Sequence, residues 1–317
     1  MRSIKILPLL ALFCPSVSHA QIHIGQDIDP RLKEFTELSV KQLDRLRGTT
    51  TIFFYSEAEE PYLDRMRAAL DTLWTVSKLE LRPMHEQDAT MKEEVSDGSR
   101  SYLTVVIETI TRDGRLSTFN PYLSLWMVEE VKGKKRRMQL AGIVLDPKRE
   151  WLNKEIGRRG SGGAMPLNNW SPGLLVCYLA GMNELLLGRK SRGYISDEVT
   201  TTALKRLKKD TLYVLDGVLE DYRVMSPTGA EKHDPNELLK DYPKPWRIVS
   251  PKEFDRLFFE RGARMLYLIS AKLSGARFIT IYDSANGAMV YGGFNGWKYN
   301  VKPSDFKDIG VAVIGGK

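Results

Sequence analysis

Residues that could carry out chemistry are scattered along this chain, without the spacing that known catalytic or metal sites require. Past the first twenty residues the histidines are His23, His85 and His233, and none forms a metal-ligand pattern. No Gly-x-Ser-x-Gly elbow and no His-Glu-x-x-His motif occurs. In adjacent pairs such as Glu59-Glu60, the side chains diverge on a strand or a helix and cannot act as one site. We therefore expect no metal site, no cofactor and no assignable catalytic residue, while carboxylates converging from distant segments keep enzymatic activity open.

One segment, residues 157–173, could hold a small ligand. Arg158 and Arg159 precede three closely spaced glycines, a composition that can form an anion-binding nest of backbone N–H groups. No Lys-Ser/Thr pair follows the glycines, so the segment does not match a phosphate-binding loop. Its alternative interpretation is a flexible linker. Arg158, Arg159 and Trp170 are the candidate ligand residues of this loop.

Aromatic side chains near the carboxyl end form a second candidate surface. Phe294, Trp297 and Tyr299 lie within a glycine-rich stretch, where they could stack on a sugar or contact a protein. The alternative is a turn packed by its own aromatic rings.

The sequence predicts that the elements positioning these residues are encoded twice, because the same order of signals begins near Leu43 and again near Leu204. In each copy a short helix leads to an apolar strand, then a second strand and a proline turn, a helix start, and a strand that runs into a hairpin. The paired segments are 51–55 with 211–215, 78–88 with 245–255, 102–116 with 265–278, and 144–151 with 300–306.

The sequence therefore predicts an α/β (α+β) fold of two tandem repeats, each an α-β-α-β-α-β-β unit with a small mixed sheet covered by helices. We expect residues 1–20 to be a signal peptide and 21–156 to be the first repeat. Residues 157–192 would form a Gly/Pro-rich linker and an apolar helix, and 193–317 the second repeat.

That apolar helix is expected over Leu174–Leu187, after a start at Ser171-Pro172. It is too short to span a membrane and should be buried between the repeats or docked on a partner. Cys177 lies within it and is interpreted as a buried small hydrophobic residue, not as a nucleophile.

The first twenty residues have the pattern of an export signal. Arg2 and Lys5 precede an apolar stretch, and Ser18-His19-Ala20 places small residues where a signal peptidase reads them. We expect cleavage near Ala20-Gln21 and a periplasmic or secreted protein with no transmembrane segment. The single remaining cysteine cannot form an internal disulfide.

Composition and charge indicate which classes of partner this chain could bind. The chain is 42% hydrophobic and carries a formal charge of +7, which indicates a folded, mildly basic protein. The basic run at 132–137 reads as a charged hairpin tip that could touch an acidic partner or a membrane surface. It is not interleaved with aromatic residues, so we expect no nucleic-acid binding.

The second half resembles a known type of α/β domain. It is similar to the TolB amino-terminal region, to CsgG-type curli secretion proteins and to penicillin-binding-protein activators, whose shared elements are structural. The matching residues here are Val249, Ser250, Glu253, Phe254, Gly262, Ala263, Asp283, Gly287 and Val290. The resemblance implies an envelope protein that works by binding other proteins, and it transfers no catalytic residue.

Two functions follow as hypotheses. The first is an exported, non-enzymatic adaptor or accessory subunit of a periplasmic or outer-membrane assembly, with an envelope protein as its partner. It would dock through exposed strand edges at 278–282 or 102–109. The candidate partner-binding residues are Phe278, Ile279, Ile281, Phe294 and Trp297.

The second hypothesis is an envelope-glycan-binding protein or hydrolase, with a cleft between the repeats. In that cleft a carboxylate such as Glu155 or Glu184 would meet Trp170 or Trp151.

Overall fold

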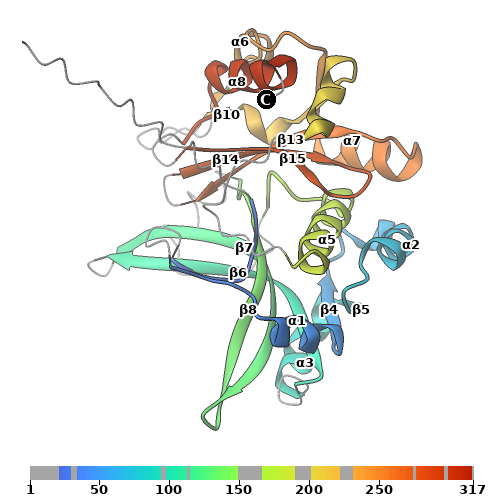
Figure 1. Ribbon diagram of the computed structural model, residues 1–317, viewed down its shortest axis with the longest axis vertical. Coiled ribbons are helices and arrows are strands. Elements are labelled where there is room, and N and C mark those ends of the chain that lie inside the picture. Colours follow the sequence, from blue (N-terminus) through green and yellow to red (C-terminus); the bar gives the residue numbers. More distant parts are fainter. Residues whose placement is uncertain are drawn as a thin grey trace, which may run out of the picture.

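The computed structural model has a mixed α/β architecture with two large mixed sheets and helices around and between them (Figure 1). The structure describes residues 21–29, 34–93, 98–112, 115–148, 166–189, 201–221, 231–273, 276–295 and 299–315. The expected signal peptide lies outside these residues.

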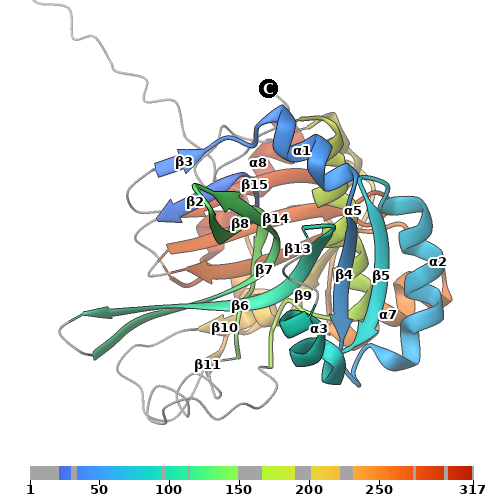
Figure 2. The same ribbon diagram turned by 90° about the horizontal axis from the view of Figure 1, so that it is seen from below.

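The first sheet has six strands. In spatial order they are β1 (Ile22–Ile24), β8 (Lys134–Val144), β7 (Arg115–Val131), β6 (Arg100–Arg112), β4 (Thr50–Tyr55) and β5 (Lys78–Pro83). Strand β4 runs parallel to both of its neighbours, and the remaining pairs are antiparallel. Two long hairpins, β6–β7 and β7–β8, extend from this sheet, and β6–β7 projects well beyond the helices (Figure 2).

The second sheet has five strands. In spatial order they are β12 (Trp246–Val249), β9 (Leu212–Leu215), β13 (Leu266–Leu273), β14 (Ala276–Asp283) and β15 (Met289–Asn295). Here β9 is parallel to both neighbours, and the β13–β14 and β14–β15 pairs are antiparallel. The order and directions equal those of β5, β4, β6, β7 and β8 in the first sheet.

Helices cover the sheets on several sides. They are α1 (Val40–Arg47), α2 (Leu63–Leu73), α3 (Gln87–Glu93), α5 (Pro172–Leu187), α6 (Pro235–Leu238), α7 (Pro251–Asp255) and α8 (Pro303–Gly315). The short or irregular helices are η1 (Glu60–Tyr62), η2 (Met84–Glu86), η3 (Thr202–Lys208), η4 (Asp216–Leu219) and η5 (Arg256–Glu260). Two short strand pairs complete the fold: β2 (Gln26–Asp29) with β3 (Glu34–Thr36), and β10 (Glu220–Asp221) with β11 (Glu231–Lys232). None of the helices in the described ranges has the length and apolarity needed to cross a bilayer.

Helix α5 lies between the two halves of the molecule, the first built around the six-stranded sheet and the second around the five-stranded sheet (Figure 1). It begins at Pro172 after Ser171, whose side-chain oxygen accepts a hydrogen bond from the backbone N–H of Leu174. Its residues are buried on almost every side, because it packs against α2, α7 and β1. The expectation that this helix is buried, with Cys177 as a core residue, is confirmed. Burial raises the pKa of the Cys177 thiol to about 12, so the reactive thiolate is suppressed.

The turn after β14 packs directly on the backbone of α5. Gly287 has φ +65°, and a Cβ there would lie 2.0 Å from the carbonyl oxygen of Cys177 and 2.4 Å from the backbone nitrogen of Gly181. Only glycine, which lacks a Cβ, permits this approach.

One expected edge strand is not an edge. Residues 278–282 lie in β14, which is paired with β13 on one side and with β15 on the other. Phe278, Ile279 and Ile281 are buried, with 1%, 4% and 0% exposure. The prediction that residues 278–282 form an exposed strand edge is therefore wrong, because the backbone groups of β14 already pair with two neighbouring strands.

Candidate functional site

The second expected edge is open over part of its length. Strand β6 pairs with β4 only from Arg100 to Leu103, whereas its pairing with β7 continues to Arg112. Strand β4, in contrast, remains paired with β5 as far as Tyr55 and Pro83. Beyond Leu103, β6 therefore has no strand neighbour on its β4 side within the part of the chain that the structure describes.

The point where β4 and β6 separate is also where helices change faces of the sheet. Met66 and Leu70 of α2 belong to the core that surrounds α5. Met91 of α3 packs on the opposite face, against the core that contains Ile52 and Phe54. In open α/β sheets ligands bind in the crevice at the carboxyl ends of the strands, where connections leave to opposite faces.

A cavity of about 390 Å³ occupies this crevice. It lies between the end of β4, the first half of β6, η2 and the segment that precedes α5. Its lining residues are Phe53, Phe54, Ser56, Ala58, Glu59, Met84, Gln87, Leu103, Thr104, Val105, Pro166, Leu167 and Trp170. Most of these side chains are apolar, which is the usual composition of a site that takes up an apolar group.

Apolar side chains continue from the cavity onto the surface. Met84 and Val105 line the cavity and are 45% and 40% exposed. Ile107 is 42% exposed and lies two residues after Val105, so it points to the same face of β6. Together these residues form an apolar strip beside the open edge.

Trp170 is held in place over the cavity by Glu59. The indole Nε1 donates a hydrogen bond of 2.8 Å to Glu59 Oε1, and the Trp170 and Phe53 ring centroids are 6.5 Å apart. Glu59 Oε2 accepts hydrogen bonds from the backbone N–H and the hydroxyl of Ser56. Glu59 is only 2% exposed, and both of its oxygens are engaged, so its role here is to position Trp170.

A second carboxylate fixes the same segment from the other half of the molecule. Asp255, at the end of α7, accepts hydrogen bonds from Ser171 Oγ at 2.6 Å and from the backbone N–H of Gly173 at 2.8 Å. Burial, opposed by these two hydrogen bonds, raises the pKa of Asp255 to about 6. The start of α5 and the neighbouring Trp170 are thus fixed by contacts from both halves.

The structure brings few of the sequence-predicted residues together. Trp170 lies at the cavity, whereas Arg158, Arg159 and Trp297 lie outside the described residues, as do Glu155 and Trp151. Phe294 is partly buried against Phe278, with ring centroids 5.2 Å apart. Glu184 is exposed near the opposite end of α5, so the carboxylate that meets Trp170 is Glu59.

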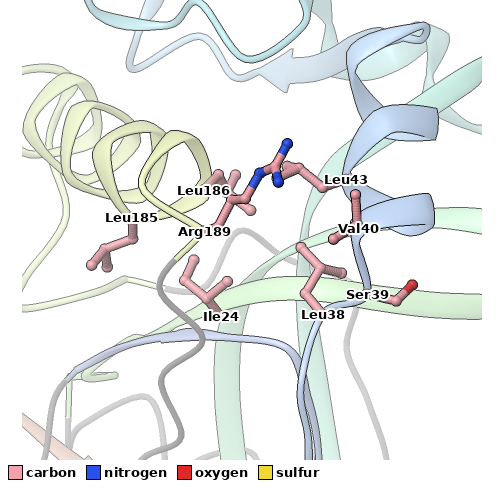
Figure 3. A pocket seen from close by; sticks show the side chains of 8 residues that line it. All are labelled: Ile24, Leu38, Ser39, Val40, Leu43, Leu185, Leu186 and Arg189. Atoms are coloured by element: carbon pink, nitrogen blue, oxygen red, sulfur yellow. The ribbon is translucent and has the colours of Figure 1, made fainter.

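Another hollow lies where α1 approaches the end of α5 (Figure 3). Its volume is about 30 Å³, too small for more than a water molecule or two. The lining side chains, mostly aliphatic, come from β1, α1, α5 and the residues beside them: Ile24, Leu38, Ser39, Val40, Leu43, Leu185, Leu186 and Arg189. Its size and its aliphatic lining are those of a packing defect.

Among the described residues no cluster of His, Cys, Asp and Glu could hold a metal ion. Comparison of the chain with protein-family models, with curated proteins and with solved structures finds no match. The function must therefore be argued from the crevice itself.

Proposed function

We propose that this chain is an exported envelope protein that binds an extended, apolar segment of another envelope protein. The segment adds as a strand to the open edge of β6 and places an apolar side chain in the cavity beside Trp170. The observation that carries this proposal is the end of β4–β6 pairing at Leu103, directly beside a mainly apolar cavity of about 390 Å³.

An extended polypeptide suits this edge because alternate residues of a strand direct their N–H and C=O groups to the same side. From Thr104 onward, the groups of β6 that point away from β7 can pair with an added strand. Main-chain hydrogen bonds then supply affinity, and pockets for alternate side chains supply specificity. Val105, which lines the cavity, and Ile107 would contact side chains on one face of the added strand.

Support for a binding role over hydrolysis comes from the carboxylates. Glu59 Oε1 and Oε2 are both engaged by protein donors, and Asp255 is a helix cap between the halves. Neither is placed as a free general acid beside an open polar cleft. The apolar lining favours a peptide side chain over a glycan.

We further propose that the two halves are copies of one α/β unit, as the sequence periodicity predicts. The equal strand order and directions of the two sheets support this, as does the matching place of η3 and α1 before the first central strand. On this proposal the first copy spans residues 21–156, and the second spans 193–317. Residues 157–192, which include α5, connect them.

Export and the resemblance to TolB amino-terminal and CsgG-type domains stay proposals that rest on the sequence. The pattern of residues 1–20 supports periplasmic or secreted localisation. The resemblance of residues 246–293 supports a role in an envelope assembly.

The test starts from the full chain, with a photo-crosslinking amino acid at Ile107, expressed in cells so that the partner segment can be mapped by mass spectrometry. A synthetic peptide of the mapped segment is then titrated against the uncrosslinked protein by calorimetry. Val105→Lys should weaken binding about tenfold or more, because it puts a charge at the cavity. Val40→Lys is the matched control, since Val40 is 53% exposed on α1 and is not among the residues that line the cavity.

Amide hydrogen exchange supplies the second measurement. Binding should slow exchange of alternate amides after Leu103 in β6, as strand addition requires. The proposal is overturned if crosslinks form only to a second copy of this chain. Equal binding by wild-type and Val105→Lys protein would overturn it as well.

A further inference from the structure

The end of the β7–β8 hairpin carries a dense group of basic side chains, which we call the basic tip (residues 132–137). Every residue of the basic tip except Gly133 is a lysine or an arginine, and all of its residues are exposed. In Figure 1 this end of the hairpin extends beyond α1 and α3, away from the rest of the molecule. None of its residues lines the cavity beside β6. The basic tip is therefore a surface separate from the peptide site proposed above.

Positive charge lies on both faces of the hairpin. Successive side chains of a strand point to opposite faces, so Lys134 and Arg136 lie on one face of β8, and Lys135 and Arg137 lie on the other. The guanidinium of Arg137 lies over the ring of Trp126, with its carbon 3.8 Å from the ring centroid. The charge thus surrounds the end of the hairpin instead of forming a stripe along one side.

The two glutamates of β7 that face the basic tip are opposite its inner residues. The strand register pairs Glu129 with Arg136 and Glu130 with Lys135. Such cross-strand pairs of opposite charge partly neutralise each other. The lysines in the turn and at the start of β8 lie farther out, beyond both pairs. The excess of positive charge is therefore greatest at the outermost point of the hairpin.

Lys132, in the turn, adopts a backbone conformation that lysine disfavours. Its φ is +52° and that of Gly133 is +73°, and the two residues connect the paired positions Val131 and Lys134. Positive φ at both central residues is the pattern of a type I′ turn, in which asparagine is preferred at the first position and glycine at the second. A side chain with a Cβ is strained there, and strain of this kind is concentrated at functional sites. The lysine weakens the turn but places a charge at its tip.

This arrangement fits a surface with distributed negative charge better than it fits a groove on a protein. A specific protein interface has an apolar core within a polar rim, and residues 132–137 include no apolar side chain. Lysine is a compact charge on a flexible stem, and near an anionic lipid surface each lysine or arginine raises the affinity about fivefold. We propose that the basic tip docks this protein, end-on, on a membrane that contains anionic phospholipids.

The experiment measures sedimentation of the purified protein with vesicles of phosphatidylglycerol and phosphatidylcholine, and with vesicles of phosphatidylcholine alone. The neutral vesicles report any binding by the apolar stretch near the amino terminus, which is the same in every variant. Wild-type protein should bind the anionic vesicles more tightly. Raising the salt concentration from about 0.1 M to about 1 M shortens the Debye length from about 10 Å to about 3 Å, so it should release this additional binding.

Lys132→Asn removes one charge and introduces a residue that the turn prefers. It should lower the affinity for anionic vesicles about fivefold, while stability in urea stays equal to that of wild type or rises. The double variant Lys132→Asn/Lys134→Gln should lower the affinity about 25-fold. Lys208→Gln/Lys209→Gln is the matched control, because it removes the same net charge from exposed lysines at the end of η3 in the second half. It should leave the affinity nearly unchanged.

Equal binding to neutral and anionic vesicles would overturn the proposal, and so would equal losses in the tip variant and its control. Polyglutamate, supplied at the same concentration of negative charge, tests an acidic protein as the partner. Tip-dependent binding to polyglutamate that is tighter than binding to the vesicles would overturn the membrane proposal. The vesicle measurement involves neither the peptide nor the β6 edge, so its outcome is independent of the peptide-binding proposal.

Discussion

Ser171 Oγ donates a 2.6 Å hydrogen bond to Asp255 Oδ1, and this contact joins the start of α5 to a helix of the second half. The two residues are 84 positions apart in sequence. The carboxylate also accepts the N–H of Gly173, so one side chain from α7 caps the helix that separates the sheets.

The ionisation of Asp255 should make stability depend on pH. Burial raises its pKa from 3.8 to about 6, so the ionised form disfavours folding by about 3 kcal/mol. That unfavourable contribution is fully present above about pH 6 and disappears as the pH falls toward 4. Asp255→Asn keeps an acceptor oxygen but cannot ionise. In urea unfolding, the variant should gain stability relative to wild type as the pH rises from 4 to 7.

The Asp64→Asn variant provides the reference for that comparison. Its stability relative to wild type should change little over the same pH range, because Asp64 is exposed. A pH-independent difference between Asp255→Asn and wild type would contradict the assignment.

Gly287→Ala should destabilise the protein far more than Gly262→Ala. Both glycines have positive φ, +65° and +58°, so each alanine incurs backbone strain of about 1–2 kcal/mol. At Gly262 nothing lies within 4 Å of the new Cβ, whereas at Gly287 the Cβ would meet the backbone of α5. We expect Gly287→Ala to lose about 2 kcal/mol or more beyond its control in urea unfolding. Equal losses would show that the turn does not pack on α5.

Asn183→Leu should destabilise the contact between α5 and the first half. Asn183 Oδ1 accepts the backbone N–H groups of Thr75 and Val76, at 2.8 and 2.9 Å. Leucine has a similar size but no acceptor, so it leaves two N–H groups unpaired, each unfavourable by about 1–3 kcal/mol. Hydrogen exchange at Thr75 and Val76 should accelerate with the loss of stability. Glu184→Leu, at the next and exposed position, should show neither change.

Local signals in the sequence predicted several elements well. Ser171-Pro172 predicts a helix start through capping chemistry, and α5 begins there. Asn286-Gly287 predicts a turn, and Gly287 adopts the positive φ that such a turn needs. These features depend on a few neighbouring residues, so the sequence contains them directly.

Strand neighbours could not be predicted in the same way. An alternation of apolar residues over 278–282 fits an edge strand and an interior strand equally, because pairing depends on segments far away in the chain. The Glu59–Trp170 hydrogen bond joins residues 111 positions apart, and no local pattern marks it. The crevice arises because β6 continues to Arg112, well past the point at Leu103 where its pairing with β4 ends. This difference depends on how the strands pair in the assembled sheet.

The central place of α5 has a consequence for the order in which the chain can fold. Leu123, Leu125 and Ile143 of the first sheet belong to the same core as Leu174–Leu179 of α5. A growing chain that has not yet reached Pro172 therefore exposes that apolar face to water. During synthesis the core of the amino-terminal half stays incomplete until α5, which lies beyond the last strand of that half, has been made. Until then its exposed apolar surface is the kind of surface that chaperones bind.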